Sequence, residues 1–271
     1  MDTPSENPFS FELLVDVHTA AQDVHEYLAF SSELEALLQR RNLELEAKIE
    51  AKLAAIPERK HNELIESYAW DLNQFQSSFP SMHRESMFIT LYNYLEYRLN
   101  TVCEGIGREM ISRVRLKHLS GRGVERAFLF IHVVPEFDLS AISAEVDFIR
   151  KANKLRNVVV HNGGLLPEGG REVVNGFVKA ESALFGQPGR RVCFGAEFVP
   201  LFAVKVQALF DGIGSEMQRF MKHRTQHHDA ADGASVSRIV QGAQCALLSS
   251  GRLNLSPELL LQLGGQDTGR W

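Results

Sequence analysis

The segment from Met87 to Ile106, MFITLYNYLEYRLNTVCEGI, decides the fold class of this chain. Apolar side chains recur in it every three or four residues, which is the spacing of one face of an α-helix. The residues with this spacing are Phe88, Leu91, Leu95, Leu99, Val102 and Ile106, and Met87, Tyr92 and Tyr94 broaden the face. So broad a stripe is typical of a buried helix. We therefore expect a long core helix, ending between Val114 and Leu116, in a mainly α-helical protein.

Upstream of this segment, the sequence predicts two polar helices that form an antiparallel hairpin. Residues 11–30 precede them and form a helix of weaker periodicity. Ser32 and Glu35 have the spacing of a capping box, which would begin the first hairpin helix. The second is expected to end at Pro80, because proline interrupts helical hydrogen bonding. Since both apolar stripes are thin, we interpret residues 1–80 as an N-terminal helical extension that packs on another part of the chain.

Downstream of the core helix, two further helices are expected. The very apolar residues 124–133 fit a strand or a helix by periodicity, and the surrounding helices favour a helix. Ser140 is a candidate N-cap for the next helix, whose apolar face includes Ile149 and Val159. Gly163-Gly164 should end that helix, because glycine accepts the left-handed conformation that closes a helix.

The remainder of the chain contains one more core helix and a polar tail. A helix is expected from about 171 to 184, a small hairpin arm within 186–195, and a last core helix over 198–221. Residues 81–222 are therefore expected to form the main helical domain. Residues 223–271 are polar and irregular, which predicts a flexible C-terminal tail.

The bulk composition favours a cytoplasmic protein that makes no membrane contact. The sequence has no continuous apolar run long enough to span a bilayer, and its start is acidic and polar, unlike a secretory signal. Its three cysteines have no zinc or redox spacing. The net charge of −5 argues against a protein that coats nucleic acid indiscriminately. Two local basic clusters fit contact with a polyanion, or are ordinary solvated helix faces: Arg108, Arg113, Arg115, Lys117, Arg122 and Arg126, then Arg150, Lys151, Lys154 and Arg156.

A polar ridge follows the helix that begins near Ser140. Asn153, Asn157 and His161 are four residues apart and so lie one above another. Arg156 and His161 differ by about 140° around an ideal helix, so they converge only if the helix frays or bends near its end. A histidine beside a fixed cation is a sensible general acid or base, and a guanidinium is a sensible clamp for a phosphate.

Residues 148–163, FIRKANKLRNVVVHNG, resemble the signature helix of HEPN proteins. That motif is an arginine, a polar residue, a few further residues and a histidine, and Arg156, Asn157 and His161 fill these places in order. The segment LYNYLEYRL, residues 91–99, is similar to the preceding long helix of the family, in which Glu96 matches an acidic residue on the inner side. The resemblance covers residues 82–221, about half of the chain.

The resemblance implies a HEPN-like up-and-down helical bundle that forms a homodimer with both signature helices at a shared cleft. Active members are metal-independent endoribonucleases without a cofactor, often toxins of toxin–antitoxin pairs or antiphage effectors. By this analogy His161 deprotonates or positions the ribose 2′-hydroxyl, and Arg156 stabilises the phosphorane. Asn157 holds the histidine or contacts a phosphate oxygen. The products would be a 2′,3′-cyclic phosphate and a 5′-hydroxyl.

Several other residues would assist this reaction. Glu96, Asn153 and Lys154 are expected to support the catalytic residues, and RNA would contact Arg150, Lys151, Arg113, Arg115 and Lys117. Besides RNA, an antitoxin or other regulatory protein is a possible partner. The alternative is a non-catalytic HEPN-like module that binds RNA or protein, in which Arg156 and His161 pair with acidic groups such as Glu96.

Metal or nucleotide chemistry elsewhere has weaker support. His223, His227, His228 and Asp229 include histidines at zinc-ligand spacing, but a solvated tail explains them better. The glycine-rich residues 186–191 lack the end of a phosphate-binding loop and are interpreted as a turn.

Overall fold

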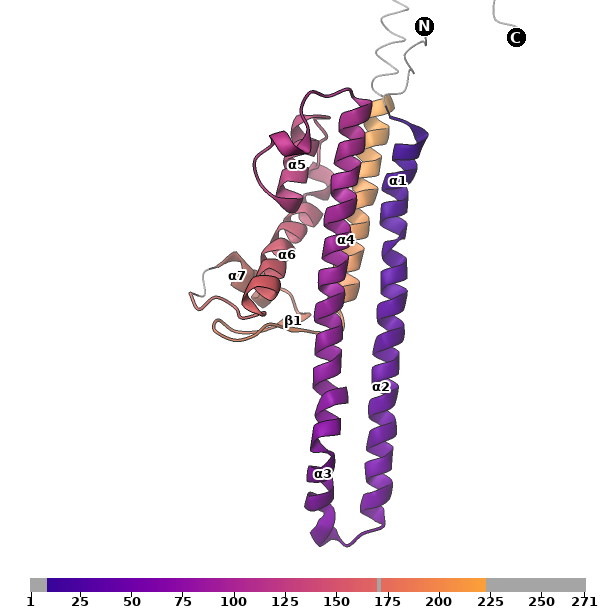
Figure 1. The fold of residues 1–271 in the computed structure, drawn as a ribbon, viewed down its shortest axis with the longest axis vertical. Helices are drawn as coiled ribbons and strands as arrows, with labels where there is room; N and C mark the ends of the chain where they lie inside the picture. The colour runs from indigo at the N-terminus through magenta and orange to yellow at the C-terminus, as the bar shows by residue number, and fades with distance from the viewer. Residues whose placement is uncertain (1–8, 170–171, 223–271) are drawn as a thin grey trace, which may run out of the picture. The chain divides into compact units, whose positions relative to one another are not determined.

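α4 (Phe79–Glu109) is the helix around which the fold is built, and it contains the segment MFITLYNYLEYRLNTVCEGI. The computed structural model describes residues 9–169 and 172–222. The helices that contact α4 include α1 (Phe11–Gln22), α2 (Val24–Ala54), α5 (Gly123–Val133) and α6 (Ser143–Asn162). A further helix, Phe198–Lys222, lies beside α4 (Figure 1). The expected mainly helical fold is confirmed, although α4 ends at Glu109 and not near Val114.

Aromatic rings from distant parts of the sequence form the centre of the core. The fully buried ring of Phe88 in α4 lies 5.4 Å from that of Phe198 and 5.1 Å from that of Phe202, centroid to centroid. The ring of Phe148 in α6 lies 6.4 Å from the same Phe202 ring. Burial of each such ring contributes about 1.5–3 kcal/mol. This cluster therefore fixes α6 and the helix Phe198–Lys222 against α4.

α1 belongs to this core and not to an extension. Leu13, Val17 and Ala21 are buried on one face of α1, at helical spacing. A Cβ atom placed on Gly105 would lie 2.5 Å from Leu13 Cδ1, so the missing side chain lets α1 approach α4 closely. The start of the chain that the structure describes thus shares one core with the later helices. The boundary expected at residue 80 does not separate two cores.

The hairpin expected in this region extends from the core as an arm, which we define as residues 32–78 (Figure 1). It comprises the distal part of α2, a connection, α3 (His61–Asn73) and a π-helical turn, Gln74–Ser78. α2 and α3 contact one another, which confirms the hairpin. Ile49 is the one buried residue of the arm, because two helices alone cannot exclude water from a broad face.

Two expected helix boundaries in this region are wrong. Ser32 is not an N-cap, because α2 begins at Val24, and the neighbouring Ser31 is instead buried with its Oγ 3.0 Å from Nε2 of His83 in α4. Pro80 does not end a helix, because it is the second residue of α4, which follows the π-helical turn directly. Proline is tolerated in a first helical turn, where its missing N–H is not needed.

The segments after α4 follow the predicted order. Residues 124–133 are helical, within α5. A 3₁₀ turn, Ser140–Ile142, precedes α6, so Ser140 does not cap α6. α7 (Val173–Ala180) is shorter than expected. The predicted small hairpin is the antiparallel pair of β1 (Leu184–Phe185) and β2 (Cys193–Phe194). The tail from 223 lies outside the described residues.

The helix Phe198–Lys222 is long and apolar enough to cross a membrane by length and composition. Its apolar face is occupied, however, because Phe202, Val206 and Phe210 are fully buried in the bundle core. The core helix of a soluble protein has the same properties, so this helix is weak evidence for a membrane span. In the part of the chain that the structure describes, no other helix passes the same test.

Candidate functional site

α6 holds the predicted motif on a regular helix that is anchored by its apolar face. Ile149, Leu155 and Val159 are buried, which leaves the polar ridge on the outer side. The helix continues to Asn162 and closes at Gly163, whose φ of 58° is left-handed. The amides of Gly163 and Gly164 both donate to the carbonyl of Val158, the latter at 3.1 Å, which closes the last turn of the helix.

Arg156 lies against the long core helix and is held there by an aromatic ring. Its guanidinium carbon is 5.6 Å from the ring centroid of Tyr92 in α4, and its Nη1 donates to Asn157 Oδ1 at 3.3 Å. Its Nε is buried without a hydrogen-bond partner. No carboxylate forms an ion pair with Arg156 among the described residues. The side chain is therefore a half-buried, positioned cation that forms no ion pair within the described residues.

Tyr92 was not among the predicted site residues. Its side chain is fully buried, and its hydroxyl has no hydrogen-bond partner among the described residues. Burial raises the pKa of Tyr92, and the Glu96 carboxylate raises it further, whereas Arg156 acts in the opposite direction. The sequence signal was an aromatic residue and an acid one helical turn apart, which places Tyr92 and Glu96 on one face of α4.

Glu96 is half-buried beside the first residue of α5. A Cβ on Gly123 would lie 3.2 Å from both carboxylate oxygens of Glu96, so the carboxylate fits there because residue 123 is glycine. No ion pair joins Glu96 to Arg156 or His161 in the described residues. The pairing that would make the motif purely structural is therefore not formed with Glu96.

The structure does not bring Arg156 and His161 together within one chain. Because α6 is a continuous α-helix as far as Asn162, the two residues keep their separation of about 140° around the helix axis. Arg156 faces Tyr92, whereas His161 is exposed at the end of α6. Arg156 and His161 therefore do not converge through fraying of the helix end, as the sequence had led us to expect.

The other polar residues of the α6 ridge differ in their engagement. Arg150 pairs with Glu125 of α5 at 3.1 Å, and its guanidinium lies over the Phe128 ring. Lys151 pairs with Asp147 one turn earlier, at 2.6 Å. Asn153 is half-buried, and Lys154 is exposed without an ion pair in residues 9–169 and 172–222. Apart from Arg156, Lys154 is thus the cation of this ridge that has no ion-pair partner among the described residues and is open to a ligand.

The predicted RNA contacts of the first basic cluster lie in the connection between α4 and α5. Arg113, Arg115 and Lys117 are all exposed, and none forms an ion pair within the described part of the chain. Arg115 and Lys117 line a pocket with Arg108 at the end of α4, whereas Arg113 does not. The first cluster is therefore divided, because Arg122 and Arg126 flank Glu125, the partner of Arg150 in the second cluster, whereas Arg108, Arg115 and Lys117 line the pocket.

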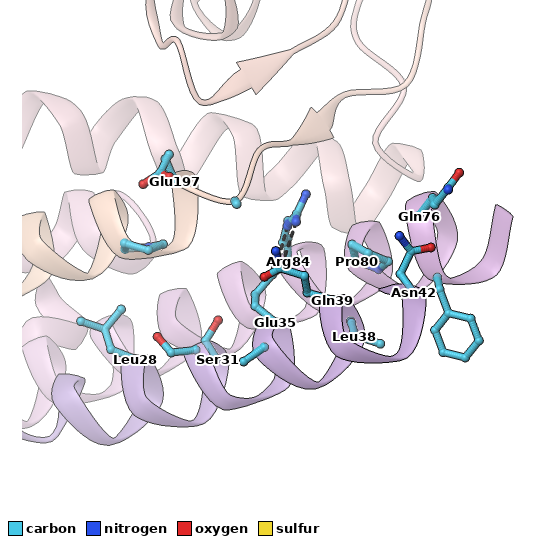
Figure 2. A pocket seen from close by; sticks show the side chains of 15 residues that line it. Leu28, Ser31, Glu35, Leu38, Gln39, Asn42, Gln76, Pro80, Arg84 and Glu197 are labelled. Atoms are coloured by element: carbon cyan, nitrogen blue, oxygen red, sulfur yellow. Dashed lines mark hydrogen bonds and ion pairs between the residues drawn. The ribbon is translucent and has the colours of Figure 1, made fainter. Parts of the chain in front are cut away.

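A second pocket, of about 660 Å³, lies at the base of the arm between α2 and α4 (Figure 2). Figure 2 shows Arg84 and Glu35 pointing toward one another there. Arg84 Nε donates to Glu35 Oε1 at 2.6 Å and Nη2 to Oε2 at 2.8 Å, while Nη1 donates to the Phe194 carbonyl. This pair joins the arm to β2. Sequence reasoning missed it, because the two partners are 49 residues apart.

Within residues 9–169 and 172–222, no group of three or more histidine, cysteine or acidic side chains could hold a metal ion. The histidines at 223, 227 and 228 lie outside the described residues. Comparison of the chain with protein-family models, with curated proteins and with solved structures finds no match.

Proposed function

We propose that this protein is a metal-independent HEPN-type endoribonuclease of the cytoplasm that acts as a homodimer. The observation that supports the proposal is the state of Arg156. A half-buried guanidinium without an ion pair is costly unless an anion reaches it, and an RNA phosphate is such an anion. The toxin or antiphage role rests on the motif resemblance alone.

The proposed reaction is a transesterification within RNA. His161 takes the proton of the ribose 2′-hydroxyl, and the 2′-oxygen bonds to the adjacent phosphorus. The bond from phosphorus to the 5′-oxygen breaks, and that oxygen takes up a proton. Arg156 stabilises the charge that develops on the phosphorane, and Asn157 keeps Arg156 in place through their hydrogen bond. The products are a 2′,3′-cyclic phosphate and a 5′-hydroxyl.

A second copy of the chain would explain how residues on different sides of α6 act together. In a two-fold dimer, His161 of one subunit can approach the Arg156 side of the other. The residues around His161 fit such a contact, because Val160 and Leu165 are apolar and about half exposed (46% and 52%). The proposed catalytic centre is thus composite, with each cleft built from both subunits.

The first experiment is cleavage of end-labelled RNA in excess EDTA by wild type, His161→Ala and Arg156→Ala. Lys179→Ala is the matched control, because it removes an exposed cation of α7 outside the motif. We expect cyclic-phosphate ends from wild type and Lys179→Ala, and at least a hundredfold loss in the two motif variants. Equal activity in all four proteins would refute the assignment.

The second experiment tests the composite centre by mixing inactive subunits. Coexpressed Arg156→Ala and His161→Ala chains give about half mixed dimers, in which one of two composite clefts is intact, so about one quarter of wild-type activity is expected. If arginine and histidine act from the same chain, mixing restores nothing.

The alternative function is a non-catalytic module that binds RNA or a partner protein, including an antitoxin. The arm favours it, because Trp70 of α3 is 70% exposed on a surface that makes no contribution to the core. If wild type binds RNA but never cleaves it, and His161→Ala binds equally, this alternative replaces the enzyme.

A further inference from the structure

A pocket of about 380 Å³ lies at the far end of α4 from the motif. Its apolar lining includes Phe130 of α5 together with Cys103 and Gly107 of α4. Its cationic lining consists of Arg108, Arg115 and Lys117. Tyr92 and Gly107 are fifteen residues apart in one helix, so this pocket lies roughly 22 Å along α4 from the Arg156 contact. It is a separate site.

The floor of the pocket is apolar and uncharged. Phe130 and Cys103 are buried, and the Cys103 thiol donates to the Ala127 carbonyl at 3.7 Å. Burial raises the pKa of the Cys103 thiol, which keeps it neutral at physiological pH. A ligand that contacts this floor therefore gains by burying an apolar or aromatic surface.

The absence of a side chain at Gly107 keeps the floor and the cations close together. A Cβ there would lie 3.1 Å from Phe130 Cζ and 3.5 Å from Arg115 Nη1. The Phe130 ring and the Arg115 guanidinium thus both lie close to Gly107. A methyl group at this position would crowd both side chains.

The loop that carries two of the cations is fixed by its own hydrogen bonds. Ser112 Oγ accepts from the Val114 amide and donates to the Val114 carbonyl, both at 3.1 Å. The amide of Arg115 donates to His118 Nδ1 at 3.2 Å, and Leu116 is buried. The backbone positions of Arg115 and Lys117 are therefore set before any ligand arrives, which lowers the entropy cost of binding.

The charges of the pocket are unbalanced in favour of an anion. Glu104 is its one acidic lining residue, against three cations. None of the three cations forms an ion pair within the part of the chain that the structure describes. Three cations around one small cavity repel each other, and an anion relieves that repulsion.

We propose that this pocket binds a nucleotide, with the base against Phe130 and the phosphate between Arg108, Arg115 and Lys117. Its volume lies in the range of small-ligand sites. A planar base suits an aromatic floor, and guanidinium groups suit a phosphate. The nucleotide is either a free mononucleotide or one unit of an RNA strand. The inference does not depend on catalysis at Arg156 and His161.

The test is isothermal titration calorimetry of the full chain with three probes: adenosine 5′-monophosphate, inorganic phosphate and a short single-stranded oligoadenylate. We expect the nucleotide probes to bind at least tenfold more tightly than phosphate. Binding of both nucleotide probes supports a site for free nucleotides. Binding of the oligoadenylate alone assigns the pocket to an RNA strand. If phosphate binds as tightly as the nucleotides, or no probe binds, the proposal is overturned.

Matched variants locate the binding. The double variant Arg115→Ala/Lys117→Ala should weaken nucleotide binding at least tenfold, whereas Lys179→Ala, which removes an exposed cation of α7 outside the pocket, should change it less than threefold. Gly107→Ala keeps the charge and should also weaken binding, with folding checked by circular dichroism. If Lys179→Ala weakens binding as much as the double variant, binding is general surface attraction and the pocket is not the site.

Discussion

Replacement of Tyr92 by phenylalanine should stabilise this protein, although most substitutions of a fully buried residue destabilise. The Tyr92 hydroxyl is buried without a hydrogen-bond partner among the described residues. Tyr94, two residues later, is the matched control, because its single hydroxyl proton lies between two acceptors, the Ala20 carbonyl at 3.1 Å and Asp23 Oδ2 at 3.0 Å. Both substitutions remove the phenolic oxygen. At Tyr92 this oxygen has no hydrogen-bond partner within the part of the chain that the structure describes, whereas at Tyr94 it is hydrogen-bonded.

The magnitude follows from the cost of an unpaired polar group. A buried hydroxyl without a partner costs about 1–3 kcal/mol, and its removal leaves a small void that offsets part of this gain. We therefore expect Tyr92→Phe to raise the free energy of unfolding by about 1 kcal/mol. Tyr94→Phe should lower it by about 1–2 kcal/mol, because the hydroxyl's shared hydrogen bond is lost and Asp23 keeps one partner fewer.

The difference in free energy of unfolding between Tyr92→Phe and wild type should also grow at alkaline pH. Burial raises the pKa of the folded Tyr92 above its ordinary value of 10.0. Because the pKa of Tyr92 is higher in the folded than in the unfolded protein, the stability that this group contributes is complete below pH 10 and is lost as the pH rises above that value. At pH 11 the unfolded tyrosine is mostly ionised, which adds about 1.4 kcal/mol to the advantage of phenylalanine.

The assay is urea unfolding followed by far-UV circular dichroism, for wild type and both variants, at neutral and alkaline pH. The difference in free energy of unfolding between each variant and wild type is the measured quantity. A loss of stability in Tyr92→Phe similar to that in Tyr94→Phe would show that the Tyr92 hydroxyl has a partner. A difference that stays constant up to pH 11 would show that the hydroxyl is open to solvent.

Two further predictions concern packing and the base of the arm. Gly212→Ala should lower the free energy of unfolding by about 1–3 kcal/mol, because its Cβ would overlap the side chain of Ile142. Gly176→Ala in α7, where no atom of the described residues lies within 4 Å of the added Cβ, should leave that free energy unchanged or raise it by up to about 1 kcal/mol. Urea unfolding measures both effects, and equal effects would contradict this packing. Glu35→Gln should lower the free energy of unfolding by about 1–3 kcal/mol and lower the melting temperature, since it leaves the half-buried Arg84 without its carboxylate partner. Differential scanning calorimetry measures both quantities. An unchanged melting temperature would mean that the ion pair contributes nothing to stability.

The features that could be predicted from sequence are those set by short-range patterns. The core face of α4 and the end of α6 at Gly163 follow from helical spacing and from the conformational freedom of glycine. Residues 124–133 were assigned correctly only because helices surround them, since their own periodicity fits a strand equally well.

The features that sequence reasoning missed depend on contacts between distant residues. Ser32 has the local pattern of a cap, but burial of Ser31 against His83 favours an uninterrupted α2. The Tyr92 ring that holds Arg156 comes from another helix, 64 positions earlier in the chain. Whether Arg156 and His161 form a catalytic centre stays a prediction, because their meeting requires a second chain.

The π-helical turn Gln74–Ser78 has a consequence for how the arm is oriented. Such a turn contains one residue more than an α-helical turn, and each residue of an α-helix turns the chain by about 100°. Because the wider turn takes up this extra residue, its loss would leave a regular helix in which α3 keeps its orientation relative to α4. Loss of one residue from a regular α-helical stretch between Trp70 and α4 would instead rotate α3 about its axis by that angle. The direction in which Trp70 is presented thus tolerates a change in residue number at this turn and at no neighbouring point of the helix.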